Sequence, residues 1–354
     1  WLVGRGQKSI EHGPIPSPFA GSGDVPCEHS LVGLLRERGE LTNLERFRDT
    51  FVTRADFVAL KAKGVNAVRV PFGYWIVTPD MHPSDHLPGR GLAYLDDAMR
   101  WAEEVGLKVL LDLHGAPGSQ SGQQTSGLEK KDWSPSDFNH TAAVETVRIV
   151  AARYAESPAL IAIELLNEPE LPARTLVSFY KEAFAAVRSA GCSAERVAVV
   201  VNLYPVPNVL IHGWLINLMM PASEYPNLVF DVHLYHAFLP LALHHFLSLA
   251  SLCGPFVDVQ AGVLFLAGRN TLVGEWSLKV PFQGAIADEY RGLGTGSRTG
   301  LLKMFAQRQL RAFDRPSTNA GHFYWTWNAP DHEKPWSLRT ALDEGWLSFG
   351  EAGQ

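Results

Sequence analysis

The sequence predicts an α/β protein with the architecture of a (β/α)8 barrel. Short β-branched runs recur along the chain, most end in polar or charged residues, and most precede a segment with helical spacing of apolar residues. The runs are apolar on both faces, as a parallel sheet covered by helices requires. The alternative is a doubly wound open sheet. It is less favoured, because no run is followed by the dinucleotide-binding pattern G-x-G-x-x-G.

Seven strands are expected, each at a clear apolar run. They cover residues 65–72, 107–114, 160–168, 196–202, 227–235, 271–276 and 321–327. The eighth would be "WLV" at residues 1–3, which is short for a strand. No internal repeat, low-complexity tract or proline-rich linker divides the chain, so we expect a single domain over residues 1–354.

Composition excludes several classes of partner. The net charge of −6 has no basic stripe, which argues against a nucleic-acid partner. No stretch reaches the roughly 18 to 20 uninterrupted apolar residues of a membrane span, and no signal segment opens the chain. Cys27, Cys192 and Cys253 lie far apart, which argues against a structural zinc site and allows one disulfide at most. The oligomeric state stays open.

Polar residues at the ends of the expected strands are the candidates for a functional site. The carboxyl ends of all barrel strands open on one face, so these side chains are expected to converge there. They are Arg69, His114, Asn167, Glu168, Asn202, His233, Tyr235, Glu275 and Trp325.

Two carboxylates stand out among them. When residues 1–3 are counted as the first strand, Glu168 stands at the end of the fourth expected strand and Glu275 at the end of the seventh. Paired carboxyl groups can hydrolyse a glycosidic bond without a metal, one protonating the leaving oxygen while the other attacks the sugar or activates water. Asn167 is placed to bond the sugar 2-hydroxyl, Tyr235 to hold Glu275, and Trp325 to form a flat floor under the sugar ring.

Each supporting residue also has a structural interpretation. Arg69 either keeps Glu275 ionised or pairs a structural acid. His114 and His233 can be core histidines, and Trp325 can be packing. In "MHPSDHLPGR", His82, Asp85 and His86 resemble metal ligands, but two prolines and a glycine fit a turn better, so we predict no metal and no cofactor.

Several motifs resemble a known family. "LLNEPE", "DLHGAPGSQSGQQTSG", "DVHLY", "VGEWS" and "YWTWN" resemble signatures of glycoside hydrolase family 5, whose members are retaining enzymes on the (β/α)8 barrel. "CEHSLVGLL", "FVTRADFVALKAKGVNAVRVPFGYW" and "KPWSLRTALDEGW" resemble its exo-β-1,3-glucanase branch, and the similarity runs from about residue 26 to residue 346.

The resemblance implies a role for each candidate. Glu168 would be the general acid/base and Glu275 the nucleophile of a retaining hydrolase, which first forms and then hydrolyses a glycosyl-enzyme. The remaining family positions are Arg69, His114, Asn167, His233, Tyr235 and Trp325. We expect a more enclosed setting for Glu168 and a position for Arg69 near Glu275. The resemblance also implies a carbohydrate substrate and secretion.

Two departures leave the substrate open. The branch usually carries a sugar-binding Glu soon after "WLV", where this chain reads "GRGQKSIEHGPIPSPFAG" with Glu11 as a weak substitute. Residues 238–268 carry hardly any charge, which is typical of a helix packed on the barrel or of an apolar wall beside the site. The open functions are an exo-acting β-1,3-glucanase or β-glucosidase, the same chemistry on a glycolipid, diglycoside or β-1,6-glucan, transglycosylation, and carbohydrate binding without turnover.

Overall fold

The computed structural model describes residues 25, 27–78, 90–205, 209–315 and 319–349. The chain packs into two compact units. Unit 1 is Trp1–Pro205 with Leu218–Leu228, and unit 2 is Val206–Asn217 with Val229–Gln354. The expected strand at 1–3, Glu11, and the turn with His82, Asp85 and His86 lie outside the described residues. That the two units form a single domain stays a prediction.

Unit 1 contains four parallel strands in chain order. They are β1 (Ala67–Gly73), β2 (Lys108–Gly115), β3 (Leu160–Glu164) and β4 (Ala198–Asn202). All four coincide with predicted runs, and β2 is buried along nearly its whole length, as a sheet covered by helices requires. Strand β3 ends at Glu164, four residues earlier than predicted, so Glu168 stands beyond the strand.

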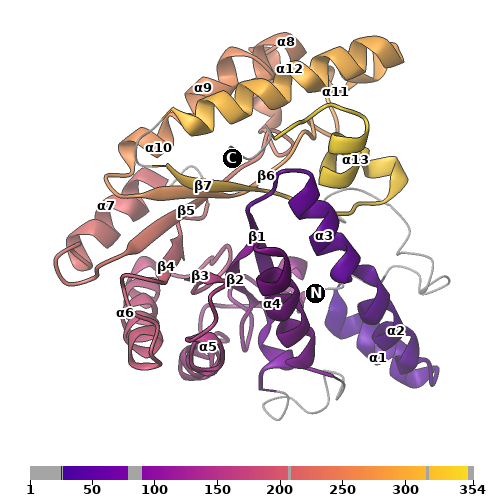
Figure 1. Cartoon of the computed structure of the whole chain (residues 1–354). Coiled ribbons are helices and arrows are strands. Elements are labelled where there is room, and N and C mark those ends of the chain that lie inside the picture. The colour runs from indigo at the N-terminus through magenta and orange to yellow at the C-terminus, as the bar shows by residue number, and fades with distance from the viewer. Residues whose placement is uncertain (1–24, 26, 79–89, 206–208, 316–318, 350–354) are drawn as a thin grey trace. The chain divides into compact units, whose positions relative to one another are not determined.

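Helices connect these strands in the predicted βα rhythm. Helix α3 (Arg54–Ala62) precedes β1, and α4 (Ala93–Val105), α5 (His140–Tyr154) and α6 (Ala173–Ser189) follow β1, β2 and β3. In unit 1, Figure 1 shows α4, α5 and α6 beside the strands that they join. Helix α6 buries Leu176, Phe179, Tyr180, Ala183 and Val187, which lie three or four residues apart and so share one face.

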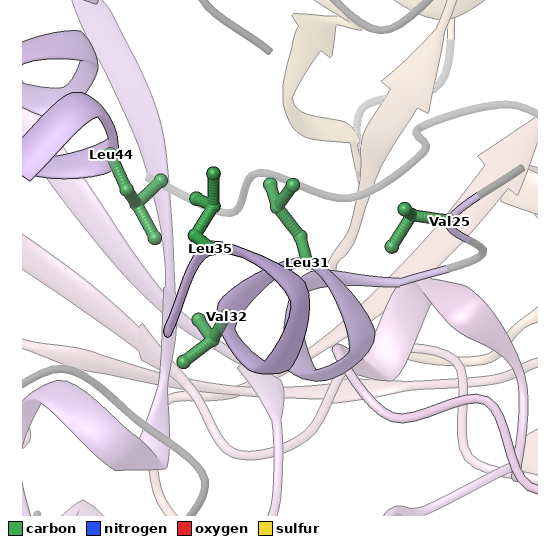
Figure 2. Close-up of a cluster of buried hydrophobic side chains, with 5 residues drawn as sticks. All are labelled: Val25, Leu31, Val32, Leu35 and Leu44. Atoms are coloured by element: carbon green, nitrogen blue, oxygen red, sulfur yellow. The ribbon is translucent and has the colours of Figure 1, made fainter. Parts of the chain in front are cut away.

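A further helical pair lies at the start of unit 1. Helices α1 (Glu28–Glu37) and α2 (Leu41–Phe51) surround an apolar cluster, shown in Figure 2, of Val25, Leu31, Val32, Leu35 and Leu44. Beside it, the carboxylate of Glu28 is fully buried and accepts bonds from Arg48 and from Trp75 Nε1, the latter at 3.0 Å. A buried carboxylate needs such donors, so this contact ties α1 to α2 and to the chain after β1.

Unit 2 contains three parallel strands, again in chain order. They are β5 (Leu228–Leu234, whose first residue belongs to unit 1), β6 (Thr271–Trp276) and β7 (Asn319–Tyr324). Strands β5 and β6 are buried throughout. An irregularity between Val232 and His233 shifts the register of this pair, and as a result His233 lies opposite Glu275. The main helices of this unit are α7 (Val209–Met219, whose last two residues belong to unit 1), α11 (Ala285–Gly292), α12 (Thr295–Asp314) and α13 (Leu338–Asp343).

The apolar segment 238–268 is not one packed helix, and that expectation is wrong. It forms the 3-10 turn η6 (Leu241–His245) and the short helices α8 (Leu249–Leu252), α9 (Pro255–Ala261) and α10 (Val263–Leu266). The chain breaks at Gly254 before Pro255, and at Gly262. Six of its described large apolar side chains are exposed, and the most exposed are Phe246 at 82%, Val259 at 70%, Leu266 at 66% and Phe265 at 57%. An apolar wall is therefore the interpretation that remains.

Part of this segment bears on the predicted absence of a membrane span. Residues Leu249–Leu266 are long and apolar enough to cross a membrane by length and composition alone, and 33% of them are buried in the structure. Asp258 interrupts the stretch and pairs with Arg308 of α12 and with Arg315, which directly follows α12. One such stretch is weak support for a span, so its absence stays a prediction.

The three cysteines are buried and unpaired. Burial raises the pKa of the Cys253 thiol to about 12, so this thiol stays protonated at neutral pH. Their role in the described structure is packing, and the one disulfide that the sequence allowed does not form among them.

Candidate active site

The predicted residues divide between the two units. Unit 1 holds Arg69, His114, Asn167, Glu168 and Asn202, and unit 2 holds His233, Tyr235, Glu275 and Trp325. In both units they stand at or just after the carboxyl ends of the strands, as the sequence predicted, except Arg69, which is the third residue of β1 and lies inside that strand.

Arg69 is the centre of a buried charge cluster in unit 1. Its Nε donates to Glu164 Oε2 at 2.7 Å, and its Nη2 lies 3.0 Å from Asp112 Oδ2. Its side chain is 3% exposed and both carboxylates are fully buried. Buried carboxylates require a paired cation, so the structural interpretation of Arg69 is confirmed. That Arg69 keeps Glu275 ionised stays a prediction, because the two residues belong to different units.

Arg69 also orients the amide of Asn167. Its Nη2 donates to Asn167 Oδ1 at 2.8 Å, which directs Asn167 Nδ2 towards the ring of His114, 3.4 Å from its Nε2. The other ring nitrogen, Nδ1, lies 2.6 Å from Asp112 Oδ2. The bond from Arg69 fixes which end of the amide faces Arg69, and the NH2 group at Nδ2 is the donor that Asn167 can offer to a ligand hydroxyl. His114 and Asn167 are thus fixed by hydrogen bonds, both almost fully buried.

Glu168 has an unusual backbone. Its φ of 38° lies in the left-handed region, which costs a residue with a Cβ about 1 to 2 kcal/mol. Such strain persists only where the surroundings fix it, and it gathers at functional sites. Glu168 is half-buried, whereas Glu275 is 5% exposed, so the expectation that Glu168 has the more enclosed setting is wrong. The reason is that Glu168 lies in the connection after β3, while Glu275 lies within β6.

Glu275 is held by the side chains of His233, which lies in β5, and of Tyr235, which directly follows β5. Tyr235 Oη donates to Glu275 Oε2 at 2.5 Å, which confirms the predicted contact. His233 Nδ1 lies 3.5 Å from the same oxygen, and its Nε2 lies 3.1 Å from Asp231 Oδ2. A phenol hydroxyl and an imidazole thus both contact Oε2 of this buried carboxylate and fix its orientation.

Asp231 is fixed in turn by the backbone of β6. Its Oδ1 accepts from Gly274 N at 2.6 Å. A Cβ at position 274 would lie 2.2 Å from Asp231 Oδ2, so only glycine fits beside this carboxylate. The "GEW" motif therefore combines the predicted nucleophile with the glycine that admits the support of His233.

Trp325 follows β7 directly. Its main-chain nitrogen donates to Trp276 O at 2.8 Å, and its side chain is half-buried. Its position at a strand end is confirmed. Its use as a floor for a sugar ring stays a prediction.

Several residues of the site were missed by the sequence analysis. Asp112, Glu164 and Asp231 lie inside strands and support the predicted residues. The signal was the pattern Asp-x-His in "DLH" and "DVH", since residues two apart in a strand point to the same face. Glu164 also supports Asn202, because its Oε1 accepts a hydrogen bond from Asn202 Nδ2 at 3.3 Å.

Tyr204 was missed as well. Burial, and then the charges of Glu168 and Glu170, raise the pKa of its phenol to about 12. Tyr204 is therefore a neutral hydroxyl near Glu168 at physiological pH.

Comparison with known proteins identifies relatives of the chain and its family. A glucan 1,3-beta-glucosidase of Candida oleophila is 30% identical to the chain, with 90% of the chain and 79% of the relative covered. One of Blumeria graminis is 29% identical, covering 87% of the chain and 76% of the relative. A rutinosidase structure from Aspergillus niger, 20% identical, matches with a TM-score of 0.70 over 92% of the chain and 90% of its own, which supports the (β/α)8 barrel.

The family model for cellulase, glycosyl hydrolase family 5, matches residues 37–330. The matched region includes all seven described strands and every predicted site residue. The chain belongs to glycosyl hydrolase family 5 and is a glycoside hydrolase that acts on β-glycosides.

Proposed function

We propose that the protein is a retaining β-glucosidase that releases glucose from the ends of β-1,3-glucan or related β-glucosides. The observation that carries the proposal is the bond from Tyr235 to Glu275, because it presents a buried carboxylate at the end of β6, the seventh strand of the expected barrel. Glu168 stands after β3, the fourth expected strand, which is where a barrel glycosidase of this kind needs its acid. The names of the similar proteins support the β-1,3 linkage.

The proposed reaction has two steps. Glu275 attacks the anomeric carbon while Glu168 gives its proton to the departing oxygen, so that one C–O bond forms as another breaks. Glu168, now ionised, takes a proton from water, whose oxygen attacks the same carbon and releases Glu275. Asn167 would donate to the sugar 2-hydroxyl, where bonds that strengthen in the transition state lower the barrier.

The supporting residues fit this division of labour. Tyr235 and His233 contact Oε2 of Glu275 and would hold the carboxylate in position for the attack on carbon. Arg69 holds the amide of Asn167 through a bond of 2.8 Å. Trp325 would lie under the sugar ring as an apolar face.

We also propose how the molecule is organised and where it acts. Both units would belong to one catalytic barrel over residues 1–354, and no cofactor is needed because the two carboxylates supply the nucleophile and the proton. Secretion is proposed from the family resemblance. Asn139 in "NHT" is a possible glycan acceptor on that route; its side-chain oxygen caps α5 by accepting from Ala142 N at 3.1 Å.

A second candidate is the same chemistry on a β-glycoside with an apolar aglycone, such as a glycolipid. The side chain of Phe238 is 50% exposed, and its ring centroid lies 5.4 Å from that of Tyr235. Phe238 opens the apolar segment that continues to Phe265 and Leu266. Exposed apolar side chains that begin beside a predicted site residue favour this candidate.

The test of the proposal is a substrate panel followed by one substitution. We expect glucose to be released singly from laminarin, with the β-anomer formed first, as seen by NMR during hydrolysis. Turnover of aryl or lipid glucosides without laminarin would favour the second candidate. Initial formation of the α-anomer would overturn the retaining mechanism.

Glu275→Gln separates an enzyme from a carbohydrate-binding protein. The amide cannot act as the nucleophile, so we expect the rate to fall on the order of 10⁴-fold or more, with binding of glucose largely retained. Unchanged turnover would exclude Glu275 as the nucleophile.

A further inference from the structure

The loop after β2 is built around one buried amide, that of Gln120. Its side chain is 1% exposed. The loop turns at Gly118 and Ser119, whose φ values of 78° and 66° place two successive residues in the left-handed region. A Cβ at position 118 would lie 1.8 Å from Asp137 O, so this turn needs glycine and directs Gln120 back towards the strands.

Gln120 joins two strand ends through its side chain. Nε2 donates to His114 O at 2.7 Å and to Asn167 O at 3.0 Å. Oε1 accepts from Ala116 N at 3.1 Å. Both hydrogens of the amide are therefore used on backbone carbonyls, one at the end of β2 and one in the connection after β3.

The main chain of Gln120 adds a second bond to the same connection. Its carbonyl accepts from Glu170 N at 3.0 Å. Gln120 thus contacts the backbone on both sides of Glu168, at Asn167 and at Glu170. Between these two bonds lies the left-handed φ of 38° at Glu168. A strained residue keeps its conformation where its neighbours on both sides are fixed.

We infer that Gln120 is a positioning residue for the general acid/base: its amide fixes the backbone on either side of Glu168 and so sets where that carboxyl group stands relative to the leaving oxygen. The inference rests on the proposed role of Glu168. Misplacement of a catalytic group by about 1 Å lowers a rate about 100-fold, so a backbone clamp of this kind is felt in catalysis.

The test compares two substrates that differ in their need for an acid. Phenyl β-glucoside has a poor leaving group that needs protonation, whereas dinitrophenyl β-glucoside leaves without it. For Gln120→Met, which keeps the volume and removes the three side-chain bonds, we expect kcat/KM to fall about 10- to 100-fold with phenyl β-glucoside and less than about 3-fold with dinitrophenyl β-glucoside. We also expect azide to raise kcat with the dinitrophenyl substrate, because azide attacks the glycosyl-enzyme without a general base.

The ratio of the two kcat/KM values is independent of how much protein is folded, because the same active molecules hydrolyse both substrates. A destabilised variant therefore still gives an answer. Gln120→Glu is the second variant: it keeps an acceptor for Ala116 N but turns a carboxylate oxygen towards the two carbonyls, and we expect the ratio to change in the same direction.

Gln309→Met is the matched control. Gln309 is fully buried and its Nε2 donates to Ser277 O at 3.1 Å, two residues beyond Glu275. Every substrate needs the nucleophile, so this variant is expected to leave the ratio within about 2-fold of the original protein. A ratio for Gln120→Met that matches this control would overturn the inference.

Glu168→Ala separates the inference from the proposed function. If Glu168→Ala shows neither leaving-group dependence nor azide rescue, the acid/base assignment fails and the inference fails with it. If Glu168→Ala shows both effects and Gln120→Met shows neither, the positioning role alone is wrong.

Discussion

Strand β2 of unit 1 and strand β5 of unit 2 carry the same pattern, Asp-x-His, with different support. In β2 the carboxylate of Asp112 lies 2.6 Å from His114, and in β5 that of Asp231 lies 3.1 Å from His233. Asp112 also pairs with the guanidinium of Arg69, whereas Asp231 accepts the main-chain N–H of Gly274. The same local motif is thus stabilised by a cation in one unit and by a backbone donor in the other.

This difference indicates where each unit is sensitive to substitution. Unit 1 concentrates charge, because Arg69 is shared by two fully buried carboxylates, those of Asp112 and Glu164. Unit 2 surrounds Glu275 with a phenol and an imidazole. Breaking a buried charge pair leaves an uncompensated ion and costs much more than the loss of a bond from a hydroxyl.

Arg69→Met is the substitution that breaks this comparison most severely. It removes the cation from two buried carboxylates, so we expect the free energy of unfolding to fall by about 3 to 5 kcal/mol. Urea unfolding measures this. Arg188→Met is the control in the same unit. Arg188 donates to the main-chain carbonyls of Cys192 and Val197, which are neutral acceptors. Removing the donor from neutral carbonyls costs less than removing it from buried carboxylates, so we expect a loss of about 1 to 3 kcal/mol in this variant. Equal losses in the two variants would contradict the charge-cluster interpretation of unit 1.

The sequence predicted the strands better than it predicted their support. The seven described strands coincide with the apolar runs because burial on both faces leaves a strong local pattern. Asp112, Glu164 and Asp231 were read as parts of those runs. Their function depends on partners in neighbouring strands, and the register that brings Asp112 opposite Glu164 is not encoded in either segment alone.

Two other features show what local sequence could and could not predict. The breaks in 238–268 had a local signal, since Gly254–Pro255 and Gly262 are poor helix residues, but the continuous apolar composition suggested a single helix. Gln120 had no such signal. In "GSQSG" it looks like a turn residue, and only the tertiary path of the loop turns its amide onto Asn167.

His236 sharpens the comparison, because it lacks an aspartate partner of the kind that His114 has in Asp112 and His233 has in Asp231. Its ring is buried between Phe305 and Phe256, with centroids 4.8 and 6.0 Å away, and neither ring nitrogen has a hydrogen-bond partner among the described residues. Burial lowers the pKa of His236 from 6.5 to about 3. The folded protein therefore keeps this imidazole neutral at pH values where the unfolded chain binds a proton.

The expected consequence is acid sensitivity that depends on His236. Its contribution to stability is complete above the unfolded pKa of 6.5 and is lost progressively as the pH falls towards about 3. Between about pH 7 and pH 5 we expect the free energy of unfolding to fall by about 2 kcal/mol more in the original protein than in His236→Met. Urea unfolding at several pH values measures the difference. Parallel pH profiles for the two proteins would show that His236 does not titrate on unfolding.

Tyr235→Phe tests the neutral support of unit 2. It deletes the hydroxyl that donates to Glu275 at 2.5 Å and leaves the ring, so we expect kcat/KM to fall about 10-fold and the free energy of unfolding by about 1 kcal/mol. Tyr154→Phe is the matched control, because Tyr154 Oη donates to Asp96 Oδ1 at 2.9 Å between helices of unit 1. It loses a phenol–carboxylate bond of the same kind, so its stability should fall similarly while kcat/KM stays unchanged. If the two variants lost activity equally, the bond at Glu275 would be serving the fold, and the case for a carboxylate positioned for attack on carbon would lose its main support.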